Sequence, residues 1–410
     1  MPTRRVIYRR RRLAVFALVL VAVMGFGYLA ATGLAPVPAS AAEISQPVPL
    51  TQPAATPQWP SFGTGAIGAV GFPGVLASNG DQAAMPIASI TKMVTALVVL
   101  EAKPLGADEA GPDITFTDAD IELYYKSLAE NGSVAPVVSG MVLTQREAFE
   151  AMLLPSANNY AASLAVWAYG SESAYLEAAN AWLTDHGLTD TVVADTSGIS
   201  SNSVSSPANL VELAKLVLGS PALAEIVALP TAVLPTIGTV TSTNKLLGTN
   251  GVDGIKTGTT DVAGACLLFS TDVQIGDETV TLVGVVLGGD THTELNDAIS
   301  ALIESVKPGF QNVTLAEKGA VYGSYTTPWG QTTNAVAGEK ASALVWSDTP
   351  IAGTITARSI QTGALGDAVG DVDFSVGDTD VSVPLVLDAA VTDPGAGWRF
   401  THPGELAAGR

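Results

Sequence analysis

Ser89 and Lys92 lie three positions apart, the spacing that places two side chains on one face of a helix. A serine hydroxyl is a weak nucleophile at neutral pH and needs a neighbouring base. An amine acts as a base only when it is uncharged, and burial among apolar side chains lowers its pKa. The run MVTALVVL, which follows Lys92, provides such a setting. The pair therefore predicts a serine nucleophile and a lysine base at the start of a helix over residues 89–102.

This helix start has two further consequences. Its free backbone N–H groups would stabilise an oxyanion that forms beside the serine. A purely structural interpretation fits the same residues, because serine is a common helix cap and a lysine can extend its charged end to water. The stretch alone does not separate these two interpretations.

Two more groups of residues have types suited to the same chemistry. Ser156 and Asn158 follow Leu-Leu-Pro at an expected break between helices, where they could face a cleft or simply begin a helix. Lys256, Thr257 and Gly258 lie in an apolar segment that is typical of a strand. A buried lysine needs a partner, such as an anionic substrate group, and the glycine would let a ligand backbone lie against the strand. The alternative is an edge strand protected by its lysine.

Each group is weak by itself, since Ser-x-x-Lys and Ser-x-Asn each occur about once by chance in a chain of this length. Residues 200–202 form a second Ser-x-Asn, and Ser242 has both Asn244 and Lys245 at the matching distances. However, the sequence LLGTNG ends any helix shortly after Ser242, whereas the helix after Ser89 continues. Helical context therefore favours Ser89 over Ser242.

The elements expected around these groups are mixed. Residues 63–80 and 265–289 have the alternation and turns of strand hairpins, the second with a turn at Gly276-Asp277. Helices are predicted over residues 144–170 (broken at Pro155, with a Thr144–Glu147 capping box), 171–188, 206–218 and 293–306. After Pro308 the pattern changes to short strands, so we predict an α/β domain over 63–308 and a small all-β domain over 309–400.

Composition excludes several classes of function. The chain has 410 residues, and outside residues 1–42 it carries 13 basic and 39 acidic residues, a net charge of −26. Such a surface repels nucleic acid. Cys266 is the one cysteine, and the three histidines are far apart, so we expect neither a disulfide nor a zinc site. No Gly-x-Ser-x-Gly surrounds a serine, which argues against a Ser-His-Asp hydrolase.

The N-terminal 42 residues predict export to the outer side of a membrane. Six arginines precede the uncharged run of residues 13–31, which is longer than most signal-peptide cores and close to the roughly 20 residues of a spanning helix. Ala39 and Ala41 also offer a cleavage site for a signal peptidase. We expect an anchored protein, or a secreted one if the segment is cleaved after Ala41. Residues 43–62 are rich in Pro and Ala and predict a linker.

Together, the three motifs and their flanks resemble the penicillin-recognising serine peptidases, the group that includes serine β-lactamases. The stretches PIASITKMVTAL, LLPSANNYA and GVDGIKTGTT look like those of low-molecular-weight D-alanyl-D-alanine carboxypeptidases, over roughly residues 63–305. The resemblance implies an antiparallel sheet flanked by helices, an all-helical subdomain and a following β domain. Within this resemblance, residues 241–247 look like the family's Asn-containing loop, which precedes the Lys-Thr-Gly strand.

The resemblance implies a role for each motif. Ser89 would be the acylated nucleophile and Lys92 its base, although the identity of the acylation base differs across this group. Ser156 and Asn158 would form the second element, with Ser156 passing a proton to the leaving amine. The residues implied in substrate binding are Lys256, Thr257, Gly258 and Thr259.

In this family pattern, Lys256 and Thr257 would bind the terminal carboxylate of a D-Ala-D-Ala stem peptide. The backbone N–H groups of Ser89 and Thr259 would form the oxyanion hole. The resemblance implies no cofactor, inhibition by β-lactams, and peptidoglycan as the partner.

The implied activity is removal of the terminal D-Ala from peptidoglycan stem peptides. A D,D-endopeptidase, a transpeptidase or a weak β-lactamase would share the acylation step and remains open, as does an inactive cell-wall-binding module. The middle motif is Ser-Ala-Asn rather than Ser-Asp-Asn. No Glu-x-x-Leu-Asn follows it at the distance found in class A β-lactamases, which disfavours an efficient β-lactamase.

Overall fold

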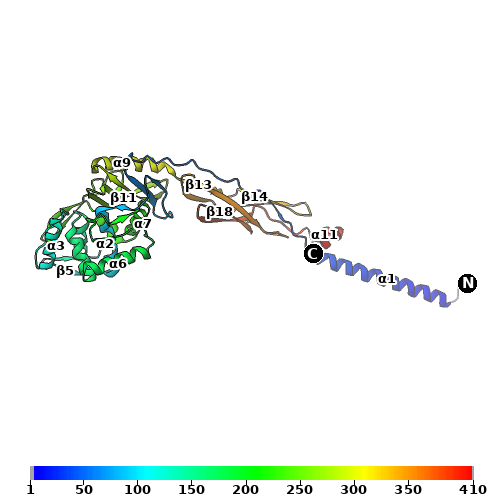
Figure 1. Cartoon of the computed structure of the whole chain (residues 1–410). Coiled ribbons are helices and arrows are strands. Elements are labelled where there is room, and N and C mark those ends of the chain that lie inside the picture. Colours follow the sequence, from blue (N-terminus) through cyan, green and yellow to red (C-terminus); the bar gives the residue numbers. More distant parts are fainter. Residues whose placement is uncertain (1–3, 409–410) are drawn as a thin grey trace. The chain divides into compact units, whose positions relative to one another are not determined.

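The structure, a computed structural model, describes residues 4–408 and divides into two compact units. The first, here called the α/β unit, is Ala55–Phe310. The second, here called the β unit, combines the described residues up to Ala54 with those from Gln311 onward. Figure 1 shows the elements of both units along the chain.

The α/β unit contains a five-stranded antiparallel sheet in the order β10-β11-β12-β2-β3. Its strands are β2 (Thr64–Ala69), β3 (Ala77–Asn79), β10 (Val252–Thr260), β11 (Gly264–Ile275) and β12 (Glu278–Gly289). The hairpin of β11 and β12 was predicted from the sequence and is confirmed, with its turn at Gly276-Asp277. Because β10 pairs only with β11 among the described strands, its other edge is free to border a cleft.

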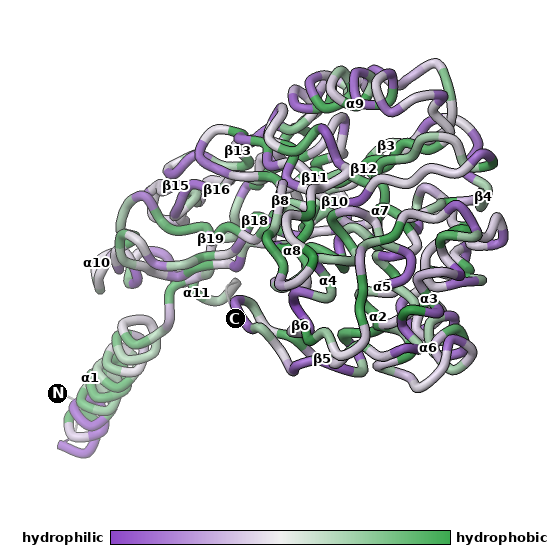
Figure 2. Tube along the Cα trace, turned by 90° about the vertical axis from the view of Figure 1, so that its left-hand side faces the viewer, coloured by the Kyte–Doolittle hydropathy of each residue, from purple (hydrophilic) through white to green (hydrophobic). Residues whose placement is uncertain are grey.

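Two helices pack on this sheet, and Figures 1 and 2 show them on opposite sides of β11. They are α7 (Pro207–Leu218) and α9 (His292–Val306). Both have the apolar stripe expected of a helix with one buried face, and both match predicted helices. The expected antiparallel sheet flanked by helices is confirmed.

The remaining helices of this unit form the helical subdomain, with α5 packed against α2, α3, α4 and α6. They are α2 (Thr91–Ala102), α3 (Asp118–Ala129), α4 (Gln145–Leu153), α5 (Asn158–Tyr169), α6 (Glu172–Asp185) and α8 (Pro221–Val227). Short helical turns η1 (Ala88–Ile90) and η2 (Lys307–Gly309) precede α2 and follow α9. The predicted Thr144–Glu147 capping box is present at the start of α4. The subdomain also holds three two-stranded pairs: β4 (Met85–Pro86) with β7 (Val204–Ser205), β5 (Asp113–Thr115) with β6 (Val142–Thr144), and β8 (Thr231–Leu234) with β9 (Gly238–Thr241).

The β unit is built on a six-stranded sheet in the order β1-β14-β15-β19-β18-β17 and a separate pair, β13 with β16. Its strands are β1 (Ala42–Ile44), β13 (Phe310–Ala316), β14 (Val321–Thr326), β15 (Thr332–Ala337), β16 (Ala341–Trp346), β17 (Ile351–Ala357), β18 (Ala368–Val376) and β19 (Thr379–Leu387). Its helices are α1 (Arg4–Gly33), α10 (Gly395–Thr401) and α11 (Pro403–Ala408). The expected C-terminal all-β region is thus present.

One strand of this sheet comes from the opposite end of the chain. Residues 42–44, which composition had assigned to the boundary of a linker, form β1 and pair with β14. Leu50 bridges to Ile351 farther along the same segment. A three-residue edge strand depends on its partner rather than on its own pattern, so the sequence did not indicate it.

Candidate active site

Ser89 lies in η1, immediately before α2, and Lys92 lies in the first turn of α2. The Lys92 side chain is fully buried, and its Nζ lies 2.9 Å from Ser89 Oγ. Ala88, just before the serine, has φ of +46°, a left-handed conformation that costs about 1–3 kcal/mol for a residue with a Cβ. The turn therefore holds Ser89 in a constrained position rather than continuing the helix backward.

Lys92 has two other contacts. Its Nζ donates to Asn158 Oδ1 at 2.8 Å and to the Ser197 carbonyl at 3.1 Å. Both of these groups only accept hydrogen bonds, so an uncharged amine uses both its hydrogens on them. Its lone pair then points at Ser89, whose hydroxyl can donate to it. This geometry suits a neutral amine that accepts the serine proton.

Electrostatics favours the same neutral state. Burial, and then the positive charge of Lys256, lower the pKa of Lys92 well below its usual value, while the negative charge of Asp195 opposes them. Burial also lowers the pKa of Lys256 to about 7. The positive charge of Lys256 thus makes Lys92 easier to deprotonate, whereas burial alone lowers the pKa of Lys256.

A loop after Asp195 positions the Ser197 carbonyl. One carboxylate oxygen of Asp195 accepts from the backbone N–H groups of Ser197 and Gly198 at 2.7 and 2.6 Å, and the other accepts from Ser200 N–H at 2.9 Å. Burial alone would raise the pKa of Asp195, but these hydrogen bonds outweigh burial and hold it below its usual value. A Cβ on Gly198 would lie 1.8 Å from the Ala88 carbonyl oxygen, so only glycine allows this loop to reach η1. No sequence signal identified this loop.

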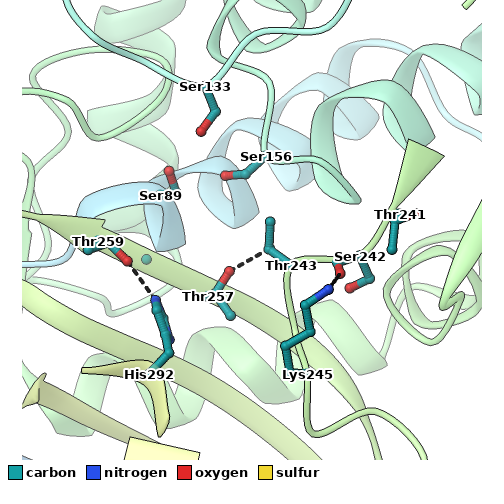
Figure 3. A pocket seen from close by; sticks show the side chains of 11 residues that line it. Ser89, Ser133, Ser156, Thr241, Ser242, Thr243, Lys245, Thr257, Thr259 and His292 are labelled. Carbon is teal, nitrogen blue, oxygen red and sulfur yellow. Dashed lines mark hydrogen bonds between the residues drawn. The ribbon is translucent and has the colours of Figure 1, made fainter.

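The second motif begins α5. Ser156 has φ of +62°, and its hydroxyl faces the cleft, while Asn158 opens the helix and turns toward Lys92. The backbone N–H of Asn158 donates to the Ser133 carbonyl at 2.7 Å. Figure 3 shows the hydroxyls of Ser89, Ser133 and Ser156 directed toward one another. The strained backbone at Ser156 is not needed for a plain helix cap, and it aims the side chain at the cleft instead.

The third motif lies on β10, the free edge of the sheet. Lys256 is buried and donates to the Thr257 carbonyl at 3.0 Å, and the Thr257 hydroxyl lies 2.6 Å from that of Thr243. A Cβ on Gly258 would lie 2.9 Å from the Ile87 carbonyl oxygen and 3.2 Å from Ser89 N. We expected Gly258 to leave room for a ligand. The structure shows that it leaves room for the chain segment that carries Ser89.

Thr259 connects this edge to α9. Its hydroxyl lies 2.6 Å from Nε2 of His292, the first residue of α9 (Figure 3). Burial, and then the charge of Lys256, lower the pKa of His292. A neutral imidazole has one unprotonated ring nitrogen, which can accept a hydrogen bond from the Thr259 hydroxyl and so orient it.

These side chains border one cleft of about 440 Å³. Of the predicted residues, the cleft is lined by Ser89, Ser156, Thr257, Gly258 and Thr259. Lys92, Asn158 and Lys256 lie behind its wall, each close to a lining residue. Of the other lining residues, the resemblance had indicated the loop that holds Thr241, Ser242, Thr243 and Lys245, while sequence reasoning assigned no site to Ser133 or His292.

Ser242 and Lys245, the second Ser-x-x-Lys of the sequence, line the cleft although we rejected them as a catalytic pair. They do not share a helix, as predicted, but they line the cleft from the loop before β10, which the resemblance had indicated. Their sequence spacing has no role there, because Lys245 Nζ contacts the Ser242 carbonyl at 3.3 Å rather than its hydroxyl.

Comparison with known proteins gives consistent results. A family model described as peptidase S11, D-alanyl-D-alanine carboxypeptidase, matches residues 73–291. The chain is 30% identical over 208 residues to the D-alanyl-D-alanine endopeptidase of Pseudomonas aeruginosa, a match that covers 49% of this chain and 64% of that protein, slightly less than two thirds of its length. It is 28% identical over 245 residues to the D-alanyl-D-alanine endopeptidase of Escherichia coli K12, covering 57% and 74%.

Solved structures share the fold. A peptidoglycan synthesis regulatory factor of Streptococcus pneumoniae aligns with a TM-score of 0.60 and 24% identity, covering 82% of this chain and all of that one. A variant of the Streptomyces K15 DD-transpeptidase aligns with a TM-score of 0.53 and 25% identity, covering 60% and 97%. The family match spans more than half of the chain and all three motifs. The protein belongs to peptidase family S11, the D-alanyl-D-alanine carboxypeptidase family of serine hydrolases.

Proposed function

We propose that the protein is a D-alanyl-D-alanine carboxypeptidase that removes the terminal D-Ala of peptidoglycan stem peptides through an acyl-enzyme on Ser89. The observation that carries this proposal is the environment of Lys92. Its buried Nζ has two fixed acceptors and lies 2.9 Å from Ser89 Oγ, so the neutral amine would keep its lone pair for the Ser89 hydroxyl. That arrangement activates a hydroxyl without a histidine.

In the acylation step, Ser89 Oγ attacks the carbonyl carbon of the D-Ala-D-Ala bond while its proton passes to Lys92 Nζ. The carbonyl oxygen becomes an oxyanion, which the N–H groups of Ser89 and Thr259 stabilise. The C–N bond then breaks, and the leaving amine takes the proton of Lys92 by way of Ser156, which returns Lys92 to its neutral state. D-Ala departs, and the rest of the stem peptide remains as an ester on Ser89.

In the deacylation step, water attacks the ester carbonyl and gives a proton to the neutral Lys92. The oxyanion forms again and collapses, and the proton returns to Ser89 Oγ as the shortened peptide leaves. Lys256 and Thr257 hold the terminal carboxylate of the substrate on β10. The low pKa of Lys256 supports this role, because a carboxylate partner would restore its charge.

Mass spectrometry of the intact protein with benzylpenicillin tests the nucleophile. A stable adduct that maps to the peptide containing Ser89 supports the proposal, and Ser89→Ala should abolish it. Ser201→Ala, an exposed serine of the unused Ser-x-Asn at residues 200–202, is the matched control and should keep it. A folded protein with no adduct at any time would leave a binding module, and a transient adduct with rapid loss of penicillin would indicate a β-lactamase.

The second candidate is a D,D-endopeptidase, because the Pseudomonas aeruginosa and Escherichia coli relatives carry that name. The two activities share every acylation residue and differ in the leaving group. A carboxypeptidase releases free D-Ala, whereas an endopeptidase releases the side-chain amine of the second stem peptide in a cross-link. Purified protein should therefore be given both a D-Ala-D-Ala pentapeptide and cross-linked muropeptide dimers. Release of D-Ala from the first with intact dimers supports the carboxypeptidase, and the reverse supports the endopeptidase.

A further inference from the structure

The apolar helix α1 has the length of a membrane span. Its uncharged run, residues 13–31, extends about 28 Å at 1.5 Å per residue, close to the hydrocarbon thickness of a bilayer. None of this apolar stretch is buried in the structure. A retained anchor and a signal peptide removed after Ala41 both fit these facts, so the residues immediately after the helix decide between them.

These residues, 34–41, are part of the packed β unit. Ala35 and Val37 are each only 4% exposed, and Ser40 is 6% exposed. Ser40 and Ile360 exchange two backbone hydrogen bonds, of 2.7 and 2.9 Å. Cleavage after Ala41 would remove these buried residues and leave β1 as the first element of the chain. A dispensable leader has no reason to fill the interior of the mature domain.

Helix α10, near the C-terminus, packs against the outer end of α1. The Tyr28 hydroxyl donates to the Phe400 carbonyl at 2.7 Å, and Arg399 Nε donates to the Ala35 carbonyl at 3.0 Å. The Phe400 ring packs on Gly33, where a Cβ would lie 3.4 Å from the nearest ring atom. These contacts join residues more than 360 positions apart in the sequence.

Side chains next to this contact fix its geometry and suit a membrane surface. Asp393 accepts from Arg399 Nη2 at 2.6 Å, and this hydrogen bond lowers the pKa of Asp393 to about 2. The Trp398 ring stacks on His402 at 4.8 Å and meets Trp329 edge-on at 5.7 Å. Tryptophan and tyrosine are enriched at the level of lipid headgroups. The end of the apolar run of α1 places this cluster at that level.

We propose that α1 stays on the mature protein as its membrane anchor and that α10 docks on the outer end of α1 as a collar in the lipid headgroup layer. The partner surface is the bilayer, with Trp398 facing the headgroups. The collar joins the β unit directly to the anchor. This inference uses only the β unit and does not depend on the proposed enzyme activity.

The intact mass of the full chain, expressed in a host with a signal peptidase and isolated from its membranes, tests retention. A mass that includes α1, in protein that resists alkaline washing and is released by detergent, supports the proposal. A mature protein that begins at Ala42 and appears in the soluble fraction overturns it.

Fluorescence quenching tests the collar. The full chain is reconstituted into phosphatidylethanolamine–phosphatidylglycerol vesicles that contain a lipid brominated near its headgroup. Trp398→Phe should lose a substantial part of the quenching seen in the unchanged protein, with the rest due to the neighbouring Trp329. Trp167→Phe, the same substitution in the α/β unit, is the matched control and should keep it. Equal quenching in the two variants overturns the collar, and thermal melting with penicillin labelling checks that both variants fold.

Discussion

Asn158→Asp tests whether Lys92 acts as a neutral base. The substitution changes one atom type and places a carboxylate oxygen where the Asn158 amide oxygen now lies, 2.8 Å from Lys92 Nζ. An opposite charge at this distance favours the protonated amine, so the pKa of Lys92 should rise. A protonated Lys92 cannot accept the serine proton. Acylation at neutral pH should therefore slow, and it should recover as the pH is raised.

The size of the effect follows from the distance. Coulomb's law gives about 6 kcal/mol for unit charges 2.8 Å apart at an effective dielectric constant near 20. Burial of the new carboxylate opposes part of this energy, and one opposite charge typically moves a pKa by about 1–3 units. We expect the acidic limb of the pH profile to move up by about 2 pH units, so that acylation at pH values on that limb is roughly 100-fold slower.

The assay is the second-order rate of benzylpenicillin acylation, measured by mass spectrometry from about pH 5 to 10. Asn158→Ala is the control, because it removes the same acceptor without adding a charge. Its loss of a hydrogen bond to the charged amine should leave the acidic limb unmoved or move it down. If Asn158→Asp slows the reaction equally at every pH, the residue only holds the fold, and Lys92 is not the titrating base.

Three further predictions concern neighbouring residues. Gly258→Ala would place a Cβ 2.9 Å from the Ile87 carbonyl and displace the segment with Ser89, so penicillin acylation should fall by about 100-fold and the free energy of unfolding by about 1–3 kcal/mol. Asp195→Asn should lower the free energy of unfolding by about 3 kcal/mol in denaturant titrations. Because the folded-state pKa of Asp195 lies below 3.8, its advantage over the variant should be present above that pH and shrink as the pH falls through the folded pKa. The folded-state pKa of His292 lies below 6.5, so the melting temperature of the unchanged protein should fall relative to His292→Gln as the pH drops below 6.5, and a constant difference would contradict the shift.

The sequence predicted the site wherever the chemistry is local. Ser89 and Lys92 could be paired because three residues of one turn bring them together, and the hydrophobic run behind them predicted the burial of the amine. The β11–β12 hairpin and the helices at the sheet faces followed from alternation and from caps for the same reason. Gly258 was recognised, but its close approach to Ile87 was not predicted, because Ile87 is far from it in the sequence.

The features that the sequence could not predict depend on contacts across the fold. Asp195 forms no motif with Lys92, and its role depends on a loop whose backbone N–H groups converge on one carboxylate. His292 reaches Thr259 because α9 begins beside the end of β10, 33 residues later in the chain. The pairing of β1 with β14 is likewise a contact between distant segments. The spacing of residues along the chain does not predict such contacts between segments that are distant in the sequence.

The two buried amines explain how one site can both bind an anion and keep a base neutral. A lone Lys92 would be held neutral by burial, but Asp195 opposes that effect, and the positive charge of Lys256 counters Asp195. Burial lowers the pKa of Lys256 to about 7, so its charge is only partly present at neutral pH. A substrate carboxylate beside Lys256 would stabilise the protonated amine and make that charge permanent. The carboxylate brings an equal negative charge, so the restored charge of Lys256 keeps Lys92 deprotonated to the extent that Lys256 lies closer to Lys92 than the carboxylate does. On this reasoning, binding of the carboxylate and activation of the serine are coupled through the charge on Lys256.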